Sequence, residues 1–145
     1  MVPKIISVRA ELRRTGRRAL LASEAALALT AAGIAIRVIP SRRMVWLLGE
    51  GGSPHTHAAT GPAGLDARRV GFAVERVAAL LPWHPVCLPQ AVATRWMLTR
   101  RGIPNEAHLG VVSTSPFSAH AWVTVDGSVV QGGSVAEPTP LASFR

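Results

Sequence analysis

The stretch Pro82-Trp83-His84-Pro85-Val86-Cys87-Leu88-Pro89-Gln90 contains the only cysteine of this 145-residue chain. Proline is tolerated in the first turn of a helix, where its missing N–H would have no partner, but not further inside. The sequence after Pro89 has helical character as far as Arg101, and a glycine and a proline follow. We therefore predict a helix that ends at Arg101, with Cys87 at or just before its N-terminus.

That position matters for thiol chemistry. The thiolate is the nucleophilic form of cysteine, and both a helix N-terminus and a nearby imidazolium favour it. His120 follows Cys87 by 33 residues on a predicted strand, and packing of that strand on the helix start would bring the two side chains together. The free N–H groups of the first turn would then face an oxyanion. The arrangement indicates a cysteine nucleophile with a histidine base.

Two other interpretations of these residues stay open. A lone cysteine is often a core residue, and a strand histidine beside a tryptophan is often structural. A metal site would combine His84 and Cys87 with His108 or His120, but zinc usually takes more thiolates or three clear protein ligands. We expect neither a metal nor a cofactor.

The period of the sequence changes from helix to strand after residue 106. Residues 107–112 and 119–125 predict two strands, and the Asp126-Gly127 hairpin turn leads to a third at 128–131. His120, Trp122 and Thr124 share one face of the second strand. From residue 132 onward the sequence looks irregular.

The length fits one domain, residues 1–145. We divide it into a basic helical N-terminal part (1–48), a flexible loop (49–64) and a catalytic core (65–145). The first part predicts a helix over about 10–38, with Gly16 and Gly33 as points where it could break. Asp66 opens a second helix, whose buried stripe is Val70, Val74, Val77 and Leu81. In the loop, His55 and His57 are expected to be solvated rather than ligands.

The net charge of +8 is concentrated at the front of the chain. Residues 1–43 hold nine basic and two acidic side chains, whereas residues 44–145 hold seven and six. Arg9, Arg13 and Arg17 fall on one helical face, which is either a solvated face or a docking surface for an acidic partner or nucleic acid. With 5% aromatic residues and a nearly neutral body, nucleic-acid binding is the less favoured class.

Residues 19–36 form an apolar run that resembles a membrane span or an export signal. The run is mostly alanine and contains Glu24, and an acid at the centre of a membrane helix costs roughly 2.5–3.5 kcal/mol. We therefore expect no membrane span and a cytoplasmic protein.

Several motifs in order carry a resemblance to a known family. They are Cys87-Leu88-Pro89-Gln90-Ala91, Trp96-Met97-Leu98-Thr99-Arg100-Arg101-Gly102-Ile103-Pro104, Leu109-Gly110-Val111 and Ala119-His120-Ala121-Trp122-Val123. Together with Pro82-Trp83 and the N-terminal helix ending at Pro40, the pattern is similar to the transglutaminase-like leader peptidases of lasso peptide biosynthesis. Each motif alone would be weak, but the ordered set is specific and covers most of the chain.

The resemblance implies an α+β fold with a papain-like or transglutaminase-like cysteine protease core and an N-terminal helical extension. It also implies that Cys87 attacks the bond between leader and core peptide and that His120 is the general base and acid. The chain resembles the split, B-type form of the peptidase. Its implied partners are the precursor peptide, a separate leader-recognition protein and a lasso cyclase.

One departure from the family concerns the residue that orients the histidine. Family members usually have an Asp after the hairpin, and this chain has no acid between Gly127 and Ala136. Counting outward from the turn puts residues 131–133 level with 120–122, so Gln131 becomes the candidate orienter on the face of His120. Glu137 is the other candidate, and a non-catalytic scaffold is the rival function.

Overall fold

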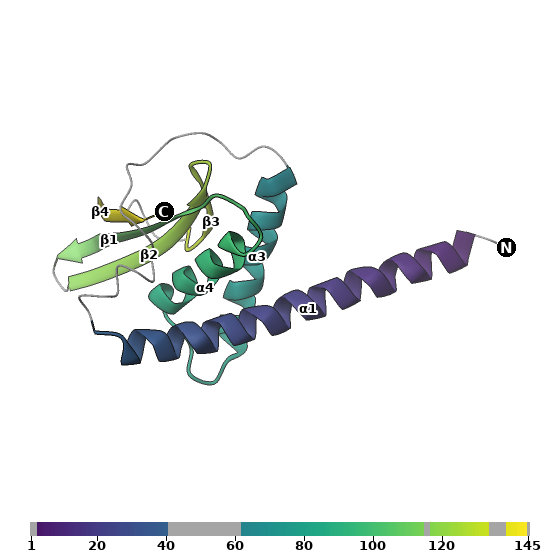
Figure 1. Cartoon of the computed structure of the whole chain (residues 1–145), viewed down its shortest axis with the longest axis horizontal. Helices are drawn as coiled ribbons and strands as arrows, with labels where there is room; N and C mark the ends of the chain where they lie inside the picture. The colour runs from purple at the N-terminus through teal and green to yellow at the C-terminus, as the bar shows by residue number, and fades with distance from the viewer. Residues whose placement is uncertain (1–2, 41–61, 115–116, 134–138, 145) are drawn as a thin grey trace.

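The computed structural model describes residues 3–40, 62–114, 117–133 and 139–144 (Figure 1). In chain order the elements are α1 (Pro3–Val38), α3 (Pro62–Leu80), α4 (Cys87–Thr99), β1 (Glu106–Thr114), β2 (Phe117–Val125), β3 (Ser128–Gln131) and β4 (Thr139–Phe144). The predicted α+β class is confirmed. Of the flexible loop expected over residues 49–64, residues 49–61, with both histidines, lie outside the described residues. Residues 62–64 belong to α3.

The strands form one antiparallel sheet in the order β3-β2-β1-β4. The alternation of β2 matches the expectation, because Ala121, Val123 and Val125 are buried. α4 packs on β2 and α3 on β3, and α1 lies across α3 and α4 on the side away from the sheet (Figure 1). β4, which the sequence left irregular, adds the outer strand beside β1.

The core lies between these layers and is built from small and branched apolar side chains. The largest fully buried side chains are Leu29, Leu98, Val70, Val74, Val92, Val123, Val125 and Thr94. The stripe predicted on α3 is present, with Val70 and Val74 buried and Val77 and Leu81 packed against the core. On α1 the buried residues are Ala25, Leu29 and Ala32, which share one helical face.

α1 is longer than predicted and is not broken at either glycine. A helix-interior glycine costs about 1 kcal/mol relative to alanine, and the surrounding Ala, Leu and Arg residues favour the helix strongly enough to absorb this. Among residues 14–38, the part of α1 whose side chains the structure describes, residues 14–20 are exposed and the first buried position is Ala25. The N-terminal half of α1 therefore extends beyond the rest of the described structure, as Figure 1 shows.

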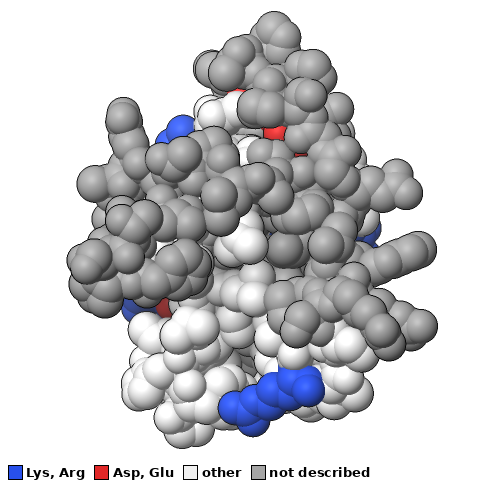
Figure 2. Space-filling view, turned by 90° about the vertical axis from the view of Figure 1, so that its left-hand side faces the viewer, with Lys and Arg blue, Asp and Glu red and all other residues white. Residues whose placement is uncertain are grey.

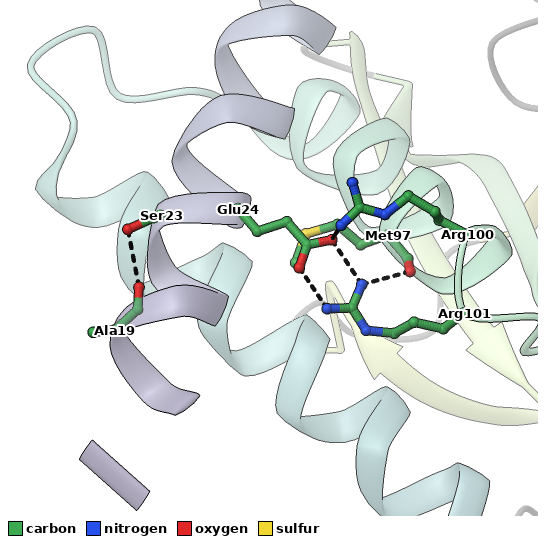
Figure 3. A network of polar contacts seen from close by, with 6 residues as sticks. All are labelled: Ala19, Ser23, Glu24, Met97, Arg100 and Arg101. Atoms are coloured by element: carbon green, nitrogen blue, oxygen red, sulfur yellow. Dashed lines mark hydrogen bonds and ion pairs between the residues drawn. The ribbon is translucent and has the colours of Figure 1, made fainter. Parts of the chain in front are cut away.

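Glu24 fixes the packed half of α1 to the end of α4 (Figure 3). Arg101 donates from Nη1 to Glu24 Oε1 at 2.7 Å and from Nη2 to Oε2, and Arg100 donates to Oε1 as well. The hydrogen bond from Arg101, and then the two positive charges, hold the pKa of Glu24 below its usual value. Glu24, which would lie inside the bilayer if residues 19–36 spanned a membrane, is thus paired with two arginines of the folded protein.

The segment Arg14–Val38 of α1 is long and apolar enough to cross a membrane by length and composition alone. A core helix passes the same test. The Glu24 ion pairs and the buried alanines attach part of this segment to α3 and α4. Only 17% of the apolar window is buried, and a signal sequence near the N-terminus passes the same test.

Glu24→Gln should lower the free energy of unfolding by about 1 kcal/mol at pH 7, because it removes a partly buried pair with two arginines. The pKa of Glu24 is lowered in the folded state, so its contribution is present above the usual Glu pKa of about 4.3 and is lost as pH falls below it. Urea denaturation of the wild type and the variant at pH 7 and pH 3 measures the loss of stability and its dependence on pH. Asp126→Asn, in the exposed hairpin turn, is the control. An equal loss at both pH values would contradict the assignment.

Gly71 of α3 marks the closest approach between a helix and the sheet. A Cβ at this position would lie 1.8 Å from the carbonyl oxygen of Val130. Gly71→Ala should therefore destabilise the fold by about 1–3 kcal/mol through overpacking. Thermal unfolding of Gly71→Ala is compared with Gly33→Ala, where a Cβ meets nothing within 4 Å and a small gain is expected. An unchanged melting temperature for Gly71→Ala would show that α3 packs on β3 differently.

Candidate active site

Cys87 is the first residue of α4, as predicted, and its thiol is half-buried. Val86 is the N-cap residue in an extended conformation and makes no side-chain cap hydrogen bond. The N–H groups of the first turn of a helix have no partner within the helix, and the positive end of the helix dipole lies there. The start of α4 thus offers backbone donors for a negatively charged oxygen next to the thiol.

The thiol lies against β2. Cys87 Sγ is 4.0 Å from the carbonyl oxygen of Ala119, the residue before His120. The pairing of β2 with β3 ends at Val123, so the first half of β2 has no partner from β3 and α4 approaches it there. The structure therefore brings Cys87 to the strand that carries His120, at the part of that strand left open by β3. The two side chains themselves are not in contact, because His120 projects from the face of β2 opposite α4.

The imidazole of His120 is held by a main-chain carbonyl. Its Nε2 is 2.7 Å from the oxygen of Gly132, and the ring stacks on Trp122 with centroids 6.1 Å apart. A carbonyl oxygen can only accept, so Nε2 carries the hydrogen and Nδ1 is the nitrogen with the free electron pair. This tautomer is the one in which Nδ1 can take a proton.

Gly132 reaches this position through its backbone conformation. Its φ is +79°, and a Cβ would lie 2.9 Å from the carbonyl oxygen of Ala121, so other residues would be strained here. The Gly132 N–H donates to Glu75 Oε1 of α3 at 2.9 Å. The two peptide groups that flank Gly132 are therefore both held. The N–H of the first binds Glu75 of α3, and the carbonyl of the second binds His120.

The register of β3 differs from the expected one by one residue. A β-bulge after the hairpin pairs Gln131 with Val123, and paired residues of antiparallel strands project to the same face. Gln131 is thus buried on the helix side of the sheet, on the face opposite His120, and its Nε2 donates to Gln90 Oε1 at 3.3 Å. The contact expected from the Gln131 amide is made instead by the carbonyl of the next residue. Glu137 lies outside the described residues.

The remaining histidines of the core are not grouped as ligands. His108 is buried, stacks on Trp122 at 5.2 Å and lies 2.7 Å from Thr124 Oγ1, and burial lowers its pKa. Among the residues that the structure describes, no three His, Cys, Asp or Glu side chains are placed to hold a metal ion.

A model of the transglutaminase-like superfamily matches residues 6–145. This chain belongs to the transglutaminase-like superfamily. The superfamily includes cysteine proteases, and the helix-start cysteine beside a small antiparallel sheet agrees with the predicted transglutaminase-like α+β core. No curated protein and no solved structure matched the chain.

Gly132→Ala should release His120 from its tautomer, because the alanine Cβ forces the carbonyl to move. Nitrogen NMR of histidine-labelled protein at pH 8 should show His120 protonated at Nε2 in the wild type and a mixture of tautomers in the variant. Gly133→Ala is the matched control, since a Cβ there meets only the side chain of an exposed valine, Val129. A wild-type His120 protonated at Nδ1 would contradict the hydrogen bond to Gly132.

Proposed function

We propose that this transglutaminase-like protein is a cysteine endopeptidase that removes the leader from a ribosomally synthesised lasso precursor peptide. The observation that carries the proposal is the position of Cys87 at the uncapped start of α4, against the strand of His120. The ordered motifs around these two residues, which resemble those of lasso leader peptidases, support the substrate class.

His120 projects from the face of β2 opposite α4, so the proposed reaction requires its imidazole to reach around the edge of β2 that β3 leaves free. There Nδ1 takes the proton of the Cys87 thiol. The sulfur attacks the carbonyl carbon of the scissile peptide bond, and the oxygen of the tetrahedral intermediate faces the N–H groups at the start of α4. The C–N bond then breaks, and the imidazolium gives its proton to the departing amine. The core peptide departs as the free amine, and the leader stays bound through its C-terminal carbonyl as a thioester of Cys87.

Water completes the cycle. His120 takes a proton from water as the water oxygen attacks the thioester, and the carboxylic acid leaves as the proton returns to sulfur. Gly132 holds the tautomer through both steps by accepting from Nε2–H. Gln131, predicted as the orienter, would act one step further away, by holding Gln90 in the first turn of α4.

The proposal includes partners and a location. The exposed half of α1 carries Arg14, Arg17 and Arg18 with exposed side chains, and an acidic surface would complement it. We assign this half of α1 to a separate leader-recognition protein that presents the leader to Cys87, with a lasso cyclase acting next. Such a complex would be cytoplasmic, where precursor peptides are made.

One observation supports a second candidate, a non-catalytic scaffold of the same complex. His120 Nε2 contacts a neutral carbonyl rather than a carboxylate, and a carbonyl supplies less charge to stabilise an imidazolium. The two candidates differ in whether the thiol reacts.

Cys87→Ala and His120→Ala should each abolish leader removal while leaving the fold intact, because they remove the nucleophile and the base. The assay mixes the protein with a candidate precursor and a candidate recognition protein, and follows the mass of the precursor. Circular dichroism checks folding, and Cys87→Ser keeps the size of the side chain as a second control. Full cleavage by Cys87→Ala would rule out the proposed function. Folded wild-type protein that neither cleaves nor reacts with iodoacetamide would favour the scaffold.

A further inference from the structure

A line of exposed apolar side chains runs along α1. Its four large members are exposed by 59–74% and are Leu20, Leu27, Ile34 and Val38. They follow one another at intervals of seven, seven and four residues, which places them on one face of the helix. The buried side chains of α1 lie on the opposite face, against α3 and α4. α1 thus has two apolar faces, and the described structure covers one of them.

The spacing of this line is that of a helix-packing seam. Apolar residues that recur every seven residues, with others three or four positions apart between them, form the narrow contact line of helices packed along their length. Ala31 continues the seam between Leu27 and Ile34 and is also exposed. From Leu20 to Val38 the seam is about 27 Å long at 1.5 Å per residue. It is therefore long enough for about five turns of a second helix.

The polar residues beside the seam are already hydrogen-bonded within α1. Ser23 Oγ donates to the carbonyl oxygen of Ala19 at 3.0 Å (Figure 3), and Thr30 Oγ1 donates to that of Ala26 at 2.8 Å. Both side chains are exposed. A partner that covers this face would thus bury no unpaired hydroxyl hydrogen, and would avoid the cost of about 1–3 kcal/mol that such a group brings.

The unpaired charges along this face are basic. Arg14, Arg17 and Arg18 precede the seam, Arg37 lies near its end, and all four side chains are exposed. Figure 2 views the end of the molecule where α1 stops, and the described surface at the bottom is largely uncharged around basic atoms. Glu24 is the only acidic residue between Arg14 and Val38 in the sequence, and it is paired with α4. Acidic groups on a partner would complement this face.

Two other occupants fit these features less well. A second copy of α1 would offer the arginines only other arginines and the paired Glu24. A helix that lies in a membrane surface has a broad apolar face, often with Trp or Phe, whereas α1 has a narrow seam and no aromatic residue. Glu24 also falls within the seam, between Leu20 and Leu27, and a charged network is costly to bury in lipid.

We propose that the exposed face of α1, from Arg14 to Val38, is a docking surface for an amphipathic helix of a partner protein. That helix has apolar residues at heptad spacing and acidic residues beside them. The inference rests on the proposed function for the identity of the partner, the leader-recognition protein. The surface itself involves neither Cys87 nor His120, so its test needs no cleavage.

The test uses two fluorescein-labelled helical peptides of four heptads each. Both carry leucine at positions a and d, and one has glutamate and the other lysine at positions e and g. Like charges at e and g keep each peptide from pairing with itself. Fluorescence anisotropy at about 0.15 M salt measures binding to the full chain. The glutamate peptide should bind roughly tenfold more tightly than the lysine peptide, a difference equivalent to about 1.4 kcal/mol.

Variants with matched controls locate the binding. Leu27→Ser and Ile34→Ser should each weaken binding of the glutamate peptide roughly tenfold, whereas Leu80→Ser, an exposed leucine of α3, should not change it. Arg17→Glu should reduce the preference for the glutamate peptide, and Arg68→Glu, the same change at an exposed position of α3, should leave it unchanged. Circular dichroism should show the same melting temperature for all of these variants, because the replaced side chains are exposed.

Equal binding of both peptides, no binding of either, or binding that survives Leu27→Ser and Ile34→Ser would overturn the docking surface. Binding to vesicles of anionic lipid that these variants abolish, without peptide binding, would assign the face to a membrane and also overturn it. So would self-association in ultracentrifugation that the same variants abolish.

Competition separates this proposal from the proposed function. A candidate recognition protein that supports leader removal should displace the glutamate peptide, and Leu27→Ser should weaken its binding. Cleavage that is supported equally well by Leu27→Ser and Ile34→Ser would overturn the docking surface while the proposed function stands. Seam-dependent binding of the glutamate peptide by a chain that cleaves no precursor and whose Cys87 does not react with iodoacetamide would support the docking surface, while the proposed function fails.

Discussion

The side chain of Gln90 connects the parts of the molecule on which the candidate site depends. Its Nε2 donates to the carbonyl of Pro85 ahead of α4, and its Oε1 accepts from Gln131 at the end of β3. Both polar atoms of the Gln90 amide are thereby satisfied, whereas the Gln131 Oε1 is buried without a partner among the described residues. This bridge fixes the start of α4 relative to the sheet, and with it the position of Cys87.

Much of the fold follows from local signals in the sequence, and the site only in part. Pro89 places a helix start at Cys87, and Asp126-Gly127 places the hairpin, because each acts through the backbone of its immediate neighbours. The bulge that moves Gln131 by one residue depends on contacts with α3 and α4, which the sequence does not display. The position of β4 is likewise set by its pairing with β1. The one local feature of the sequence that could have predicted the bulge is the Gly132-Gly133 pair directly after β3, because glycines often occur at bulges.

The charged side chains in the two halves of α1 have different surroundings. Glu24 is satisfied within the fold by Arg100 and Arg101, at the end of α4 opposite to Cys87. Arg14, Arg17 and Arg18 instead lie on the half that extends beyond the described core. These three arginines lie on the exposed part of α1, away from the buried contacts of the described structure, and under the proposed function they would face an acidic surface of the recognition protein.

A backbone carbonyl can replace an orienting side chain because a general base first requires the correct tautomer. The oxygen of Gly132 accepts from Nε2–H and leaves the electron pair on Nδ1. The same glycine is held from its other side, because its N–H donates to Glu75 Oε1, and Trp122 stacks on the His120 ring. Because glycine alone fits the backbone there, the orienting group depends on conformation rather than on side-chain chemistry, and sequence motifs built on an acid would not detect it.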